Sequence, residues 1–201
     1  MIHMRQQYEP AIDEKECDRI VMQHCIQLAR GILEQHRFTA GGPDGIKRLC
    51  LRQRHLHKKG IMFTTFVFSL VIADMLGVEF LWSSDSDTIV FPDSLSRTID
   101  TIAADPQAAG ASSGLIIHNF ADSIISKLSS TVYWGELYLT RSTTAVTLTS
   151  DCQSGPCSVF RLSALPDMLV PWYLQTILGK RMVCPPVQQF TPLHSFQEIN
   201  I

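Results

Sequence analysis

The spacing of apolar positions changes along the chain, and these changes predict alternating helices and strands. Between residues 13 and 36, apolar side chains such as Val21, Cys25 and Leu28 recur every three or four positions, which is the spacing of one helix face. Residues 78–84 ("VEFLWSS") instead begin with a nearly continuous apolar run. Such a run is typical of a central strand that is buried on both faces in a parallel sheet.

The same pattern predicts the remaining elements. Further helices are predicted over residues 58–77, 92–106, 123–143 and 166–180, with a stop at Gly77, an end before Pro106 and a break near Pro171. Further strands are predicted over residues 46–52, 108–119 and the end of 151–161. Residues 184–201 have no periodicity and are predicted to be irregular. Alternating strands and helices favour an α/β, Rossmann-like sheet, which binds ligands at the carboxyl ends of its strands.

Composition narrows the class of protein. The chain has 201 residues, of which 45% are hydrophobic, and its net charge is −2, so it is long enough for one α/β domain with a core. Basic residues gather in a stretch without acidic ones, which suits a phosphate or an anionic surface. They are Lys47, Arg48, Arg52, Arg54, Lys58 and Lys59. No aromatic residue lies between them, so nucleic-acid binding is not expected.

The cysteines and the longest apolar stretch indicate the compartment. The six cysteines do not form the two pairs of a metal quartet, and the chain does not open on a signal-peptide pattern. Residues 61–73 form the longest apolar stretch, which is shorter than the roughly 20 residues that a membrane helix needs. The sequence therefore predicts a soluble, cytoplasmic chain without a transmembrane segment.

Two carboxylates follow the predicted central strand. Asp85 and Asp87 are one residue apart, so in an extended segment both project to the same side. Their mutual repulsion is offset if they share a divalent cation, and magnesium is typically held by one or two carboxylates together with substrate phosphates. The alternative interpretation is a solvated turn after the strand, with an aspartate capping the next helix.

Two other segments have polar groups that suit a phosphorylated ligand. Lys58 and Lys59 precede an apolar helix, where a cation could contact phosphate, or they form a solvated basic face. Ser154, Gly155 and Pro156 provide a turn with free hydroxyl and backbone donors, which suits a loop around a polar ligand. A plain turn between a helix and a strand explains the same three residues.

Together these segments resemble the catalytic domain of processive family 2 glycosyltransferases, of the hyaluronan- and chitin-synthase type and especially the fungal polysaccharide synthases. The resemblance extends over about residues 46–183. Its motifs are "HKKGIMFTTF" (57–66), "FLWSSDSDTIVFPDSL" (80–95), "STVYWGELYLTRST" (130–143), "DCQSGPCSVFR" (151–161) and "WYLQTILGKRMV" (172–183). The D-S-D-T motif combined with S-G-P and a following Arg161 is fairly specific.

The resemblance implies a GT-A nucleotide-diphospho-sugar transferase fold and transfer of a sugar from a UDP-sugar to a growing polysaccharide. Asp85 and Asp87 would hold Mg²⁺ or Mn²⁺, with Asp85 also contacting the nucleotide. Lys58 would lie near the uridine diphosphate. The other substrate-binding positions would be Ser154, Gly155, Pro156 and Arg161. In full-length relatives the enzyme is expected at the cytoplasmic face of a membrane.

The sequence also departs from the family pattern. The earlier strand with a nucleotide-binding aspartate is missing, and Cys184, Pro185 and Pro186 stand where an acidic motif should supply the general base. The later Q-x-x-R-W motif is absent too. Residues 1–183 are therefore expected to form a partial catalytic domain, incomplete at both ends, with residues 184–201 as a divergent tail. No catalytic residue is assigned, and loss of a general base typically costs a factor of about 10²–10⁴ in rate.

Two other functions fit parts of the pattern. A phosphohydrolase could use Asp85 as nucleophile and Asp87 as acid and base, although the later acidic pair of such enzymes is not evident. A non-catalytic binding fragment would explain the missing motifs.

Overall fold

The computed structural model describes residues 13–39, 49–54, 56–140, 142, 157–178, 180–181 and 196–199. The chain forms two compact units. Unit 1 comprises Met1–Leu81 and Leu162–Pro185, and unit 2 comprises Trp82–Arg161 and Pro186–Ile201.

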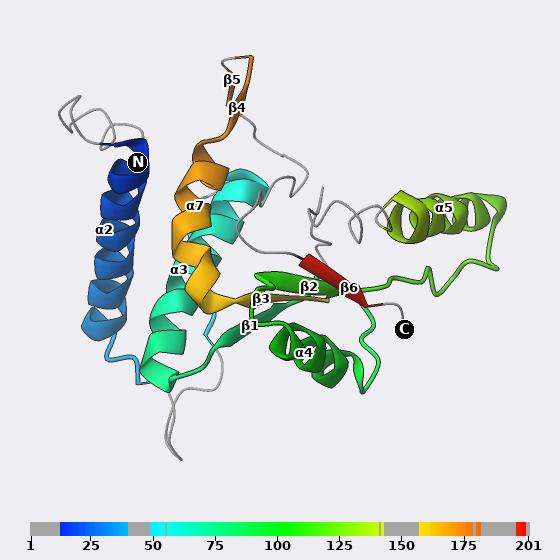
Figure 1. Cartoon of the computed structure of the whole chain (residues 1–201), viewed down its shortest axis with the longest axis horizontal. Coiled ribbons are helices and arrows are strands. Elements are labelled where there is room, and N and C mark those ends of the chain that lie inside the picture. Colours follow the sequence, from blue (N-terminus) through cyan, green and yellow to red (C-terminus); the bar gives the residue numbers. More distant parts are fainter. Residues whose placement is uncertain are drawn as a thin grey trace. The chain divides into compact units, whose positions relative to one another are not determined.

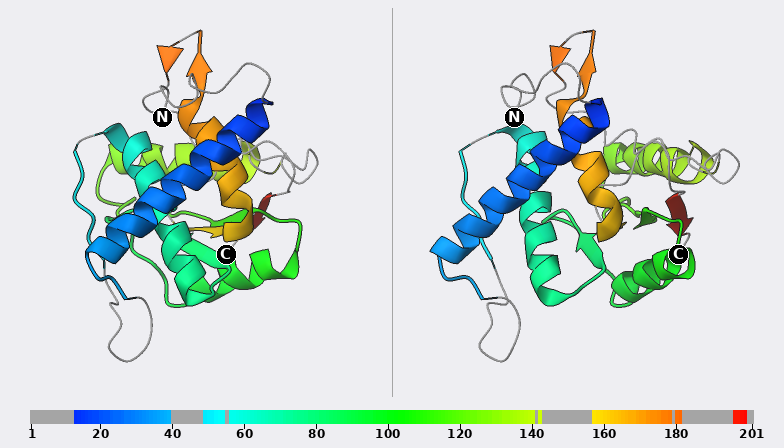
Figure 2. Two further views of the ribbon diagram at one scale, coloured as in Figure 1. Left: turned by 90° about the vertical axis from the view of Figure 1, so that its left-hand side faces the viewer. Right: turned by 60° about the vertical axis from the view of Figure 1, so that its left-hand side comes forward.

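Unit 1 is built around three helices that contact one another: α2 (Glu14–Gln35), α3 (His57–Leu76) and α7 (Leu165–Leu174) (Figures 1 and 2). The ring centroids of Phe63 in α3 and Tyr173 in α7 are 4.7 Å apart. Buried side chains on all three helices form the core, including Val21, Phe63, Val71, Leu165 and Leu169. A short 3₁₀ helix, η3 (Leu162–Ala164), precedes α7, and a two-stranded hairpin of β4 (Thr176–Ile177) and β5 (Lys180–Arg181) follows it.

The helices predicted at residues 13–36 and 58–77 are confirmed as α2 and α3. In α2, the buried residues Cys17, Val21 and Leu33 lie on the apolar face that the sequence indicates. In α3, Gly77 is the C-cap residue and has a left-handed backbone with φ of 64°. Because glycine adopts this conformation without a steric penalty, it ends the helix at the predicted position.

Unit 2 contains a small mixed sheet. Its strands are β1 (Phe80–Ser83), β3 (Ser158–Arg161), β2 (Gly110–Ser113) and β6 (Phe196–Ile199), in that spatial order; the unit boundary falls within β1. Strand β2 pairs antiparallel with β3, with Ala111 opposite Val159, and parallel with β6. Helix α4 (Ser94–Ala104) packs against β2 and β3 (Figure 1). Its residues Thr98 and Ile102 are fully buried.

The predicted arrangement of the sheet needs correction. The sequence predicts parallel strands with residues 78–84 at the centre, whereas β2 and β3 are antiparallel and β1 lies at an edge of the described sheet. All four residues of β1 are only half-buried, as expected of a strand with a partner on one side. An apolar run indicates that side chains avoid water, but it does not determine which strands pair.

Four local predictions also differ from the structure. Residues 49–52 are not a strand, and the predicted helix at 123–143 divides into α5 (Ile124–Trp134) and a π-helical segment, η1 (Gly135–Thr140). Pro171 lies inside α7, which ends only at Leu174, because burial of neighbouring side chains outweighs the lost backbone hydrogen bond. Within the tail that was predicted to be irregular, Phe196–Ile199 forms β6.

One described helix is long and apolar enough to cross a membrane. It is α3, whose 20 residues have a mean hydropathy of 1.6 in their most apolar window, of which 44% is buried. Since α3 also packs against α2 and α7, its composition agrees equally with a core helix of unit 1.

Two glycines in unit 1 should respond to alanine in opposite directions. Gly77→Ala places a side chain on a left-handed backbone and should lower the free energy of unfolding by about 1 kcal/mol. Gly31 lies in α2, where an added Cβ meets no atom within 4 Å. Gly31→Ala should therefore raise the free energy of unfolding by about 0.5–1 kcal/mol. Urea unfolding measures both values, and equal signs for the two variants would contradict the assigned helix end.

Candidate functional site

Asp85 and Asp87 lie in an exposed turn that follows β1. The backbone N–H of Thr88 donates to the carbonyl of Asp85 at 3.2 Å and closes this turn. The hydroxyl of Ser84 donates to the same carbonyl at 3.3 Å. Both carboxylates are exposed, and neither has a hydrogen-bond or salt-bridge partner among the described residues. They are therefore accessible to a ligand from solvent.

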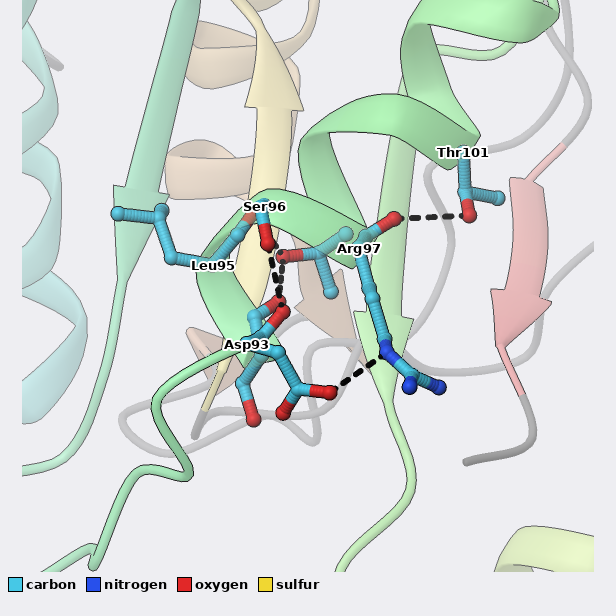
Figure 3. Close-up of polar contacts among 7 residues, drawn as sticks. Asp93, Leu95, Ser96, Arg97 and Thr101 are labelled. Atoms are coloured by element: carbon cyan, nitrogen blue, oxygen red, sulfur yellow. Dashed lines mark hydrogen bonds and ion pairs between the residues drawn. The ribbon is translucent and has the colours of Figure 1, made fainter.

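The helix after this turn begins without help from either carboxylate. The N-cap residue of α4 is Asp93, whose carboxylate forms an ion pair of 2.7 Å with Arg97 (Figure 3). Its carbonyl accepts a hydrogen bond of 3.0 Å from the hydroxyl of Ser96. The structure therefore agrees with the alternative of an exposed turn followed by a helix with an aspartate at its N-cap position, although the Asp93 side chain makes no capping hydrogen bond.

Three residues that the sequence analysis did not select hold the turn against the sheet. The Ser84 hydroxyl lies 3.9 Å from the Cys157 thiol. The Cys157 carbonyl accepts hydrogen bonds from the backbone N–H of Ser113 at 3.1 Å and from its hydroxyl at 3.2 Å. Because Ser84 precedes Asp85 and Cys157 follows Pro156, these contacts bring the flanks of the two predicted motifs together.

The position of Cys157 is conformationally strained. Its φ is 52°, in the left-handed region that residues with a Cβ seldom adopt, and only 4% of the residue is exposed. Ser154, Gly155 and Pro156 themselves lie outside the described residues. Sequence proximity to the two motifs is the only signal that could have singled out Ser84 and Cys157.

Arg161 lies at the end of β3 and is directed at the backbone of α4 and of the segment that follows this helix. Its guanidinium donates to the carbonyls of Ile102, Asp105 and Ala108, at 2.7, 3.0 and 2.9 Å. The substrate-binding role that the resemblance implies for Arg161 remains a prediction, and these contacts identify a second role within the fold.

The two lysines before the apolar helix have different environments. Lys58 is exposed in the first turn of α3, where it is accessible to an anion. Lys59 is buried, and its Nζ lies 5.4 Å from the centroid of the Trp172 ring, within the range of a cation–π interaction. Lys58 belongs to unit 1, whereas Asp85, Asp87 and Arg161 belong to unit 2.

The available ligands suit a hard cation that a substrate also coordinates. No group of three or more histidine, cysteine, aspartate or glutamate residues forms among the residues that the structure describes. Asp85 and Asp87 offer carboxylate oxygens only, which Mg²⁺ and Mn²⁺ accept. Two carboxylates do not complete a site for such an ion, but they fit one that also takes ligands from a diphosphate.

Comparison with known proteins identifies relatives of this chain. No protein-family model matches the chain. Hyaluronan synthase 3 of Homo sapiens is 32% identical over 132 residues, which are 66% of this chain and 23% of the relative. The chain is similar to hyaluronan synthases. Hyaluronan synthase 2 of Rattus norvegicus is 31% identical over 137 residues, 67% of the chain and 24% of the relative.

A third relative extends this similarity. Hyaluronan synthase 3 of Xenopus laevis is 28% identical over 156 residues, which are 73% of the chain and 27% of the relative. The chain thus spans about a quarter of the length of the hyaluronan synthases that it matches. This similarity agrees with the hyaluronan-synthase type of resemblance that the sequence motifs indicate.

The strain at Cys157 can be measured with two variants that both lack the thiol. Cys157→Gly should unfold with a free energy up to about 1 kcal/mol higher than Cys157→Ala, because only glycine adopts a left-handed backbone without a steric penalty. Urea unfolding of the two proteins provides the comparison. A glycine variant that is no more stable than the alanine variant would show that the backbone here is not strained.

Proposed function

We propose that this chain binds a UDP-sugar together with Mg²⁺ or Mn²⁺, as part of a family 2 glycosyltransferase that extends a polysaccharide. One observation carries the proposal: Asp85 and Asp87 are exposed after a strand and have no side-chain partner among the residues that the structure describes, in a chain that resembles hyaluronan synthases.

Each proposed role follows from the chemistry of the side chain. Asp85 and Asp87 hold the cation, which when bound neutralises negative charge on the diphosphate leaving group. Asp85 also orients the nucleotide. Lys58 is an exposed cation at the start of a helix and contacts the diphosphate. Ser154, Gly155 and Pro156 offer hydroxyl and backbone groups to the donor sugar and the acceptor.

Residues 1–183 form the part of the chain to which we assign catalysis. We assign no general base, because Cys184, Pro185 and Pro186 stand at the position that the family pattern gives to an acidic motif. Without proton transfer from the acceptor hydroxyl, sugar transfer by this chain alone should be slower by about 10²–10⁴-fold than with a base. Donor binding does not need the base and is therefore the property to measure first.

The proposal predicts cation-dependent binding of a sugar nucleotide. UDP-N-acetylglucosamine and UDP-glucose are titrated into the protein by calorimetry, with and without Mn²⁺. At least one should bind more tightly with Mn²⁺. Asp87→Ala should weaken that binding by about tenfold or more, because even the outer-shell partners of metal ligands contribute about 10–100-fold.

Asp100→Ala is the matched control, since Asp100 is an exposed aspartate of α4 in the same unit. It should bind the donor as the wild type does. Affinities that are the same with and without Mn²⁺, and the same in wild type and Asp87→Ala, would refute the proposed site. Release of phosphate from a generic phosphomonoester would favour the phosphohydrolase instead.

A further inference from the structure

The C-terminal end of α4 lacks the groups that usually complete a helix. Its last turn contains no basic residue to balance the negative end of the helix dipole. In a continuing helix the backbone N–H of residue 106 would donate to the Ile102 carbonyl, but residue 106 is proline and has no N–H. Ile102 is fully buried, so water cannot replace that donor.

Arg161 provides what the helix lacks, from a strand that is distant in the sequence. One terminal nitrogen, Nη2, donates to Ile102 at 2.7 Å and to Asp105 at 3.0 Å, and Nε donates to Ala108 at 2.9 Å. The backbone N–H of Arg161 donates to the carbonyl of Ala109 at 2.8 Å. A positive charge at the C-terminal end of a helix also interacts favourably with its dipole.

These contacts connect the segments that follow the two motifs. Helix α4 is the next helix or strand after the turn with Asp85 and Asp87, with residues 89–93 between them, and β3 comes directly after Ser154–Pro156 and Cys157. The guanidinium of Arg161 fixes the C-terminal end of α4 to β3, and the turn with Asp85 and Asp87 precedes the N-terminal end of the same helix. Because Ile102, Asp105 and Ala108 occupy three of its N–H donors, those donors are not available to a diphosphate.

We propose that Arg161 is a positioning residue: it caps α4 from β3 and thereby holds Asp85 and Asp87 in the arrangement that binds the cation. The positioning of Asp85 and Asp87 rests on the proposed function. The capping of α4 depends only on the hydrogen bonds of Arg161. It differs from the substrate-contact role that the family resemblance implies for this arginine.

Mn²⁺ binding without nucleotide separates the two roles. An arginine that only contacts phosphate does not affect Mn²⁺ affinity when no nucleotide is present. An arginine that positions the carboxylates does. Electron paramagnetic resonance of free Mn²⁺ measures this affinity directly, at a temperature at which each variant remains folded.

The closing experiment uses the full chain and five variants. Arg161→Met removes the cap, and Arg161→Lys keeps the charge without the planar set of donors. Arg97→Met is the matched control, because Arg97 lies on α4 and makes an exposed ion pair. Pro106→Ala, alone and combined with Arg161→Met, restores the N–H that Ile102 can accept.

Arg161→Met should lower the melting temperature by about 4–8 °C, since charged hydrogen bonds to buried carbonyls are lost. It should also weaken Mn²⁺ binding about tenfold, a loss typical of groups that orient metal ligands. Arg161→Lys should recover part of both properties. Arg97→Met should change neither appreciably, and Pro106→Ala should reduce the destabilisation caused by Arg161→Met.

Three outcomes would overturn the inference. Unchanged Mn²⁺ affinity with weaker UDP-N-acetylglucosamine binding would make Arg161 a phosphate ligand. A lower melting temperature with both affinities unchanged would leave a cap without a positioning role. If the wild type binds neither Mn²⁺ nor UDP-sugar, the proposed function fails and the positioning role with it; the coupling between Arg161 and Pro106 then still confirms or refutes the cap.

Discussion

The pairing of β2 with β3 is the constraint on which unit 2 depends. It places Gly110, Ala111 and Ser112 opposite Phe160, Val159 and Ser158, and all six residues are buried. From this pairing Cys157 reaches Ser84 and Ser113, and Arg161 reaches the carbonyls at the end of α4. The segments next to the candidate site are thus connected by contacts between residues that are far apart in the sequence.

In unit 2, a half-buried polar side chain stabilises the fold, whereas exposed polar side chains are assigned to ligand binding. The half-buried guanidinium of Arg161 donates to the backbone carbonyls of Ile102, Asp105 and Ala108 at the end of α4 and just beyond it. Asp85 and Asp87 are exposed and without described partners, although two neighbouring carboxylates repel each other. A cation that binds both would remove this repulsion, which is why the acidic pair and not the arginine is assigned to ligand binding.

In unit 1, two neighbouring lysines differ in exposure in the same way. Lys59 lies against Trp172 in the helical core, four residues before Phe63, which is also buried, whereas Lys58 is exposed. An aromatic face stabilises a buried ammonium group that would otherwise be costly to remove from water. The sequence pattern shows two adjacent cations and does not distinguish their environments.

The sequence by itself determined most of the local elements and placed the acidic pair at the end of a strand. Helical spacing predicted α2, α3 and α4, glycine at position 77 predicted the end of α3, and an apolar run predicted the strand before Asp85. These features depend on interactions within a few residues, such as dipole, dihedral and hydrogen-bond preferences, which a sequence displays directly.

Only the tertiary structure decided the order and direction of the strands, the burial of Lys59, and the contacts of Cys157 and Arg161. The antiparallel β2–β3 pair and the edge position of β1 depend on which segments meet after folding. The orphan carbonyl created by Pro106 could be predicted from the sequence, but its donor lies 59 residues away and is brought there by the sheet. Long-range pairing selects such partners, and local residue preferences carry no information about them.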